Sequence, residues 1–189
     1  MNLIIFASGT GTNAAAIIEW FKANGKARVS LIVCNKPGAG VLNIAEREGI
    51  PVMMIDRHTF DDDATVAALR AHAPALIILA GYLWKIPPAL TQAFPDRIIN
   101  IHPALLPSYG GKGMYGGNVH TAVIAAGETH SGITIHYVNE EYDKGNVILQ
   151  AHCNVLPGDT PGALAKRIHK LEHYYFPRTI EFLLDNMEA

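Results

Sequence analysis

The sequence predicts an α/β fold, a Rossmann-like open and mostly parallel seven-stranded sheet flanked by helices. Three observations lead to this prediction. Short apolar, β-branched runs recur along the chain, helical patterns separate the first five of them, and a glycine-rich loop joins the first run to the first helical pattern. Strands that alternate with helices form right-handed βαβ units, so most strands of such a sheet run parallel.

The expected strands are apolar runs bounded by Gly, Pro or Asn. They lie at residues 3–7, 29–34, 52–55, 75–80, 98–101, 133–138 and 147–151. The expected helices follow from apolar spacing and capping residues. They lie at residues 13–23, 41–48, 61–71, 119–126 and 160–186, with one short turn or two at 87–94.

Capping residues set the expected starts of two of these helices. The acidic run at residues 61–63 caps the third helix, and Asp159 or Thr160 caps the last one, with Pro161 in its first turn. We expect the last helix to pack on the sheet through Tyr174, Tyr175 and Phe176.

Length and composition predict one cytoplasmic domain. A chain of 189 residues is long enough for one compact core, and no linker or internal repeat divides it, so we expect a single domain over residues 1–189. No uncharged apolar run approaches the roughly 18 residues of a membrane span, and the apolar start at residues 3–7 is too short for a signal peptide. We therefore expect no membrane partner.

Charge and cysteine content argue against further kinds of partner and site. The net charge is −2 and no basic run is clustered, which argues against a nucleic-acid surface but permits a small anionic ligand. Cys34 and Cys153 lie far apart without CxxC spacing, so they indicate neither a disulfide nor a cysteine metal site.

The stretch "FASGTGTNAAAII" after the first expected strand is typical of a phosphate-binding turn. Gly9 and Gly11 allow a tight backbone turn, Thr12 and Asn13 can cap the following helix, and the free N–H groups of a helix start favour an anion. The dinucleotide pattern also requires an acidic residue after the second strand, where this chain has Cys34-Asn35-Lys36. We therefore favour a monophosphate, with a plain connecting turn as the alternative.

Asn100 and His102 lie two residues apart near the carboxyl end of an expected strand, so their side chains share one face. The proline- and glycine-rich loop that follows is a candidate lid. Asp143, in a polar loop between the last two strands, could reach this pair, raise the pKa of His102 and hold it as an imidazolium. Taken alone, Asp143 is equally typical of a turn.

Other histidines give weaker signals. Residues 169–173 spell H-x-x-E-H, an inverted zinc-protease motif, but no third ligand with suitable spacing can be identified. We assign no catalytic role to His120, His130, His136 or His152. His136 is the least certain of these, because it lies on the strand that leads to Asp143. A non-catalytic nucleotide-binding module would use the glycine loop alone.

Several motifs together resemble one family. They are the loop at residues 8–13, "LAGYLWKI" at 79–86, "NIHPALLPSYGG" at 100–111, "HSGITIHYV" at 130–138 and "YDKGNVILQ" at 142–150. The chain resembles the folate-dependent formyltransferases over nearly its whole length. The loop at 8–13 and "EHYYFP" at 172–177 are similar to the glycinamide ribonucleotide branch.

The resemblance implies the formyltransferase fold and a transfer of the formyl group of 10-formyltetrahydrofolate, as co-substrate, to the amine of glycinamide ribonucleotide, without a metal. It implies small-molecule partners and a monomer or homodimer. The catalytic residues that it implies are Asn100, His102 and Asp143. The implied substrate-binding residues are Gly11, Thr12, Asn13 and Glu172. The implied folate-binding residues are Leu83, Trp84, Lys85, Ile86 and Glu141.

Two departures and two alternatives accompany this resemblance. The family often has Met-Arg where this chain has Leu83-Trp84, and the loop at 108–118 is richer in glycine. A formyltetrahydrofolate hydrolase or a formyltransferase for another amine are the alternatives within the class. Such enzymes normally carry an additional domain, so we favour glycinamide ribonucleotide as the acceptor.

Overall fold

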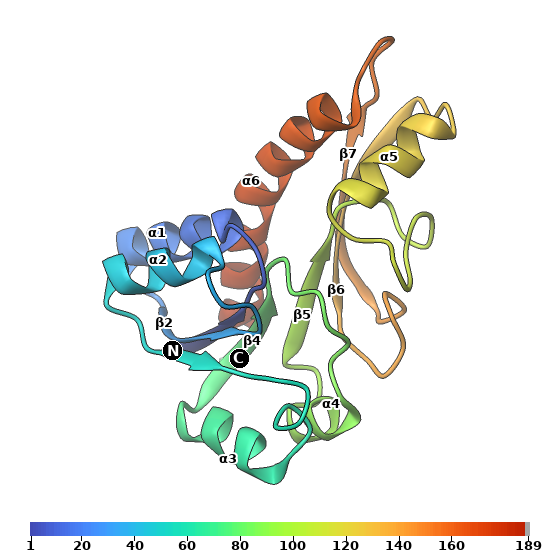
Figure 1. Ribbon diagram of the computed structural model, residues 1–189. Coiled ribbons are helices and arrows are strands. Elements are labelled where there is room, and N and C mark those ends of the chain that lie inside the picture. The colour runs from blue at the N-terminus through green and yellow to red at the C-terminus, as the bar shows by residue number, and fades with distance from the viewer. Residues whose placement is uncertain (188–189) are drawn as a thin grey trace.

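The computed structural model describes residues 1–187, which form one seven-stranded sheet with helices on both faces (Figure 1). The strands follow the spatial order β3-β2-β1-β4-β5-β6-β7. Their bounds are β1 (Asn2–Phe6), β2 (Arg28–Cys34), β3 (Val52–Met54), β4 (Pro74–Leu79), β5 (Ile98–His102), β6 (His130–Tyr137) and β7 (Val147–Asn154). All seven predicted strands are therefore present, and the predicted fold class is confirmed.

The direction of the strands explains where a ligand can bind. Strands β1 to β5 pair in parallel, whereas β6 pairs antiparallel with both β5 and β7. After β3 the chain returns to the other side of β1, so the strand order switches between β1 and β4. In open α/β sheets, ligands bind outside the carboxyl ends of the strands at this switch point.

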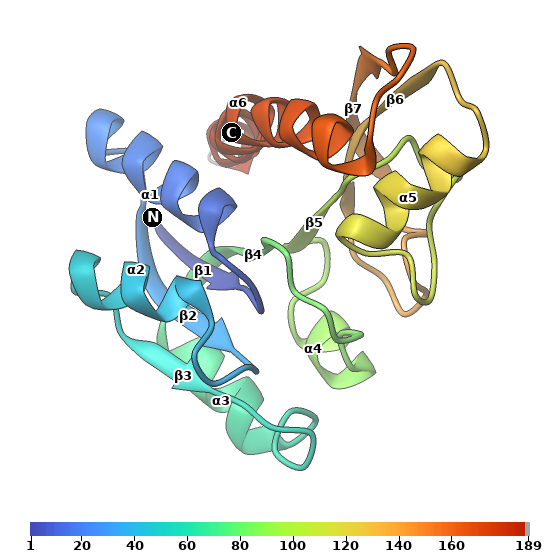
Figure 2. The ribbon, with the colours of Figure 1, turned by 45° about the horizontal axis from the view of Figure 1, so that its top comes forward.

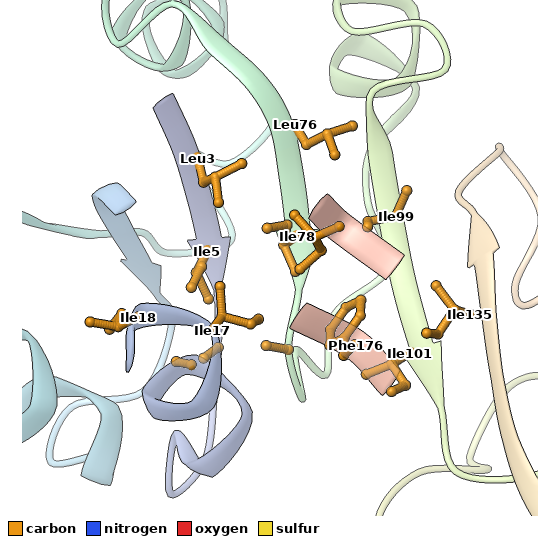
Figure 3. Close-up of a cluster of buried hydrophobic side chains, with 14 of the residues drawn as sticks. Leu3, Ile5, Ile17, Ile18, Leu76, Ile78, Ile99, Ile101, Ile135 and Phe176 are labelled. Atoms are coloured by element: carbon orange, nitrogen blue, oxygen red, sulfur yellow. The ribbon is translucent and has the colours of Figure 1, made fainter. Parts of the chain in front are cut away.

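Helices cover both faces of the sheet because side chains alternate along each strand. In β1, Leu3 and Ile5 face one core and Ile4 and Phe6 face the other. The first core packs against α1 (Thr12–Asn24), α2 (Gly40–Glu48), α5 (Gly117–Ala125) and α6 (Pro161–Met187), and the second against α3 (Asp63–Ala71) and α4 (Pro88–Ala93). Figure 3 shows Phe176 of α6 among side chains of the first core.

Helix α6 joins the two halves of the first layer. It runs between α1 and α5 and contacts both (Figure 2). Its buried face includes Phe176 and Ile180 and, unusually for a charged residue, Glu172. No helix within residues 1–187 combines the length and the apolar character that crossing a bilayer requires.

Most caps follow the prediction, but one does not. The Asp62 side chain accepts a hydrogen bond from Thr65 N at 2.7 Å at the start of α3, and the Thr160 hydroxyl accepts one from Ala163 N at 3.2 Å in α6. Helix α1 has Gly11 at its N-cap with no side-chain cap. The prediction that Thr12 and Asn13 cap this helix is therefore wrong.

The aromatic run near the middle of α6 is only partly buried. Phe176 is fully buried and Tyr175 packs against the core, as predicted. Tyr174 is 53% exposed and lies under the Arg178 guanidinium, 3.9 Å from its ring centre. The prediction that Tyr174 packs on the sheet is wrong because this position faces away from the sheet on the helix.

Candidate active site

A cavity of about 490 Å³ lies at the carboxyl ends of β1, β4 and β5, at the switch in strand order. Every residue for which the resemblance implies a role contributes to its wall. These residues are Gly11, Thr12, Asn13, Leu83, Trp84, Lys85, Ile86, Asn100, His102, Glu141, Asp143 and Glu172. The structure thus brings together side chains from five separate segments of the sequence in one cavity.

The glycine loop forms one end of this cavity. Gly11 has φ +79°, and a Cβ atom there would lie 2.8 Å from Val41 Cα, so the turn requires glycine. Ala15 N donates to Gly11 O and closes the first turn of α1. The N–H groups of Thr12, Asn13 and Ala14 precede that bond and have no acceptor within the helix. They form a natural site for an anionic group.

Glu172 lies beside the glycine loop although it is only 5% exposed. Its Oε2 accepts hydrogen bonds from Asn13 Nδ2 at 3.0 Å and from His169 Nδ1 at 2.9 Å. The hydrogen bond to Glu172 raises the pKa of His169, against the effect of burial. Asn13 therefore positions an acidic side chain in the cavity wall rather than capping the helix.

Asn100 and His102 lie at the end of β5, and the antiparallel neighbour β6 supplies the partner of Asn100. Asn100 pairs with His136 across the two strands. His136 Nδ1 lies 2.8 Å from Tyr137 O, which requires a proton on Nδ1. Its Nε2 is then free to accept from Asn100 Nδ2 at 3.1 Å. His136 thereby fixes the orientation of the Asn100 amide.

The loop after β6 places Asp143 against this pair. Asp143 has φ +55°, and at Gly145 a Cβ atom would collide with the Tyr137 carbonyl. The Asp143 carboxylate accepts from Gly111 N at 2.8 Å and lies 3.7 Å from His102 Nδ1 and 3.6 Å from His136 Nε2. Burial raises the pKa of Asp143, but the contacts with His136 and Gly111 N lower it by more. The net shift of this pKa is therefore downward, and the carboxylate is ionised.

His102 differs from the prediction in its protonation. Its side chain is nearly inaccessible, and its Nε2 lies 2.7 Å from Tyr109 O and therefore carries a proton. Burial lowers the pKa of His102 below its ordinary value, and Asp143 and Tyr109 O offset only part of this effect. The prediction that Asp143 holds His102 as an imidazolium in the free site is wrong, because desolvation outweighs the nearby carboxylate.

The segment between Leu83 and Ile86 forms another part of the cavity wall. Leu83 is 44% exposed, and its N–H donates to Ser8 Oγ at 3.1 Å. The Trp84 ring has the Arg57 guanidinium 5.0 Å from its centre, and Lys85 Nζ lies 5.7 Å from the Tyr142 ring. This wall offers apolar and aromatic surface with backbone polar groups, a composition suited to a flat heterocycle.

Sequence reasoning missed two histidines that line the cavity, His120 and His136. The antiparallel register of "HSGITIHYV" with β5 is the signal that could have found His136, because it sets position 136 opposite Asn100. His169 and His173 of the H-x-x-E-H motif have stacked rings with centres 6.2 Å apart. No group of three or more His, Cys, Asp or Glu side chains within residues 1–187 is arranged to hold a metal ion.

A sequence model of a protein family, described as formyl transferase, matches residues 1–180. The chain belongs to the formyl transferase family. This confirms the resemblance that the motifs predicted. Among its relatives, the chain is 43% identical to the chloroplastic phosphoribosylglycinamide formyltransferase of Arabidopsis thaliana, over 94% of this chain and 63% of that protein. It is 39% identical to the phosphoribosylglycinamide formyltransferase of Bacillus subtilis, over 95% and 93% of the two chains.

Solved structures of the formyl transferase family agree with the fold. The phosphoribosylglycinamide formyltransferase of Anaplasma phagocytophilum is 33% identical with a TM-score of 0.90, over 98% of this chain and 87% of that one. Glycinamide ribonucleotide transformylase 1 of Geobacillus kaustophilus is 37% identical with a TM-score of 0.86, over 97% and 98%. The chain spans 63% and 61% of the two plant relatives that it matches.

Proposed function

We propose that this protein transfers the formyl group of 10-formyltetrahydrofolate to the amine of glycinamide ribonucleotide, a step of purine biosynthesis. One observation carries the proposal. A single cavity has an anion site at the start of α1, a buried carboxylate at Glu172, and the Asn100, His102 and Asp143 cluster at the strand ends. The bacterial and plant relatives named as phosphoribosylglycinamide formyltransferases support the same reaction.

The acceptor fits this cavity from its phosphate to its amine. The phosphate would lie on the N–H groups of Thr12 and Asn13, and the sugar hydroxyls would face Glu172. The amine would then reach Asn100 and His102. The folate would lie against the wall formed by residues 83–86 and Glu141, with its formyl carbon directed at the same pair.

Attack of the amine on the formyl carbon forms a C–N bond and an oxyanion. Asn100 gives one N–H to His136, so its second N–H remains for the oxyanion, and such a donor contributes about 3 kcal/mol. Neutral His102 has its Nδ1 lone pair on the side of Asp143, so it can take the proton that the amine loses. The imidazolium that results is stabilised by Asp143 and can pass the proton to the folate nitrogen as the second C–N bond breaks.

The decisive experiment mixes the purified protein with 10-formyltetrahydrofolate and follows loss of the formyl donor optically, with and without glycinamide ribonucleotide. Loss that depends on the ribonucleotide supports the transfer. Equal loss without it indicates a hydrolase. No loss in either sample overturns the proposed reaction, and other primary amines then become the acceptors to test.

The remaining expectations are part of the proposal. The protein would act without a metal, as a single domain over residues 1–189, in the cytoplasm and as a monomer or homodimer. Its partners would be the two small substrates rather than nucleic acid or a membrane. Activity after exhaustive dialysis against a chelator, and mass by light scattering, test the first and last of these.

A further inference from the structure

Buried side-chain nitrogen and oxygen atoms without a hydrogen-bond partner are few among residues 1–187, and three of the five belong to residues of the cavity wall. These three are Asn13 Oδ1, Tyr82 OH and His120 Nδ1. Buried polar groups in native proteins are normally satisfied, so an unpaired one in a ligand cavity marks a group that a ligand can satisfy. His120 is the one whose role no motif predicted.

His120 is held rigidly. It lies in the first turns of α5 between the fully buried Val119 and the core residue Val123, and its side chain is only 2% exposed. The ring therefore presents a fixed donor and acceptor to whatever enters the cavity, without an entropy cost for ordering it.

Charged and titratable groups from both ends of the cavity act on His120. Burial lowers its pKa, Glu172 raises it, and the neighbouring His169 and His102 lower it. The ring is thus within electrostatic reach both of the carboxylate beside the anion site and of the histidine at the strand ends. An acceptor that extends from the glycine loop to Asn100 passes His120 with its sugar.

We propose that His120 is a positioning residue for the acceptor and makes a hydrogen bond to a ribose hydroxyl, opposite Glu172. The nitrogen of a neutral imidazole that faces a hydroxyl group can be a donor or an acceptor, according to the tautomer, and a hydroxyl group can pair with either. Glu172 can only accept, so the two residues together can satisfy both hydroxyls of a ribose. This inference rests on the proposed acceptor and adds a contact for its sugar.

The test compares His120→Leu with His120→Asn in steady-state kinetics with both substrates. Leu fills the space without a polar atom, whereas Asn restores one near the position of Nδ1. We expect the KM for glycinamide ribonucleotide to rise about tenfold in His120→Leu, with kcat changed less than about threefold and the KM for the folate unchanged, as for loss of one buried hydrogen bond. His120→Asn should recover most of the acceptor KM.

His173→Leu is the matched control. His173 also has an unpaired buried nitrogen and also feels the charge of Glu172, but it does not contribute to the cavity wall. We expect its thermal midpoint to change while its acceptor KM stays within about twofold, the limit set by a purely structural role. An equal rise of the acceptor KM in His173→Leu and His120→Leu would show a structural effect and overturn the proposal.

Acceptors that lack the 2′ or the 3′ hydroxyl sharpen the assignment. Removing the hydroxyl that His120 contacts should raise the acceptor KM of the wild-type protein about tenfold and leave that of His120→Leu unchanged. If the acceptor KM rises equally in both proteins with either analogue, the proposed contact between His120 and the ribose is wrong. Wild-type turnover in the same assay separates the hypothesis about the acceptor from the hypothesis about the His120 contact. If the wild type turns over and His120→Leu has an unchanged KM for glycinamide ribonucleotide, only the His120 contact is overturned. If the wild type does not turn over, the acceptor and the contact are overturned together.

Discussion

The two walls of the cavity differ in how they hold their side chains. At the strand ends, Asn100, His102 and Asp143 are fixed by neighbours whose atoms lie 2.7 to 3.7 Å away. In the wall formed by residues 83–86, Leu83 is 44% exposed, and the Trp84 ring contacts Tyr82, Phe60 and the Arg57 guanidinium. The first group of side chains is held by hydrogen bonds between individual atoms, and the second by the packing of rings. Substitutions should therefore change kcat in the first group and the KM for the folate in the second.

The largest expected effect is that of Asp143→Asn. The substitution keeps an oxygen for Gly111 N but removes the charge that stabilises the His102 imidazolium. We expect kcat to fall by roughly 10²–10⁴-fold, the range of a lost acid–base group, with little change in either KM. A loss of less than about fivefold would remove Asp143 from the proposed proton path. Glu140→Gln, in the same loop but exposed and outside the cavity wall, is the matched control.

Asn100→Ala should have the next largest effect. It removes the N–H left for the oxyanion, so kcat should fall by about 10²–10³-fold while the substrates still bind. His136→Gln should lower kcat by much less, because His136 acts through its contacts with Asn100 and Asp143. Comparable losses in the two variants would mean that His136 itself contacts the reacting groups, and unchanged turnover in Asn100→Ala would favour a non-catalytic module.

Most of the fold, but not the protonation of the site, could be predicted from the sequence. The strands and helices follow from local periodicity, and the alignment of Asn100 with His102 follows from strand geometry alone. The Asn100–His136 pair depends on the antiparallel register of β6, a non-local feature. The pKa of His102 depends on how deeply the loop at 108–118 buries it, and local sequence pattern does not encode that depth.

Buried histidines in and beside the cavity should make the stability of the protein sensitive to acid. The pKa values of His102, His120 and His173 are lowered by burial, so the unfolded chain binds protons at these residues before the folded one does. The free energy of unfolding should therefore fall as the pH drops below about 6.5, by up to ~1.4 kcal/mol per pH unit for His102 and by less for His120 and His173, whose charges solvent screens more. His169, whose pKa is raised, acts in the opposite direction.

Denaturant titrations between pH 7 and pH 5 test this expectation. His120→Leu removes one group with a lowered pKa, so its unfolding free energy should depend less on pH than that of the wild type. Trp84→Leu, on the other wall, should leave the dependence unchanged. If the free energy of unfolding depends on pH as steeply in His120→Leu as in the wild type, the pKa of His120 is not lowered in the folded protein.

The smallest effect is expected for Trp84→Leu in the kinetic assay. The ring contacts the apolar Phe60 and Tyr82 and lies under the Arg57 guanidinium, so Leu keeps part of the surface but loses the flat face and the cation–π contact. We expect the KM for the folate to rise by about threefold to tenfold, in line with roughly 1 kcal/mol for such contacts, with kcat and the acceptor KM unchanged. Leu156→Ala, at a more exposed position outside the cavity wall, is the control. A fall in kcat comparable to that of Asn100→Ala would erase the contrast between the two walls, because this wall would then also position the reacting atoms.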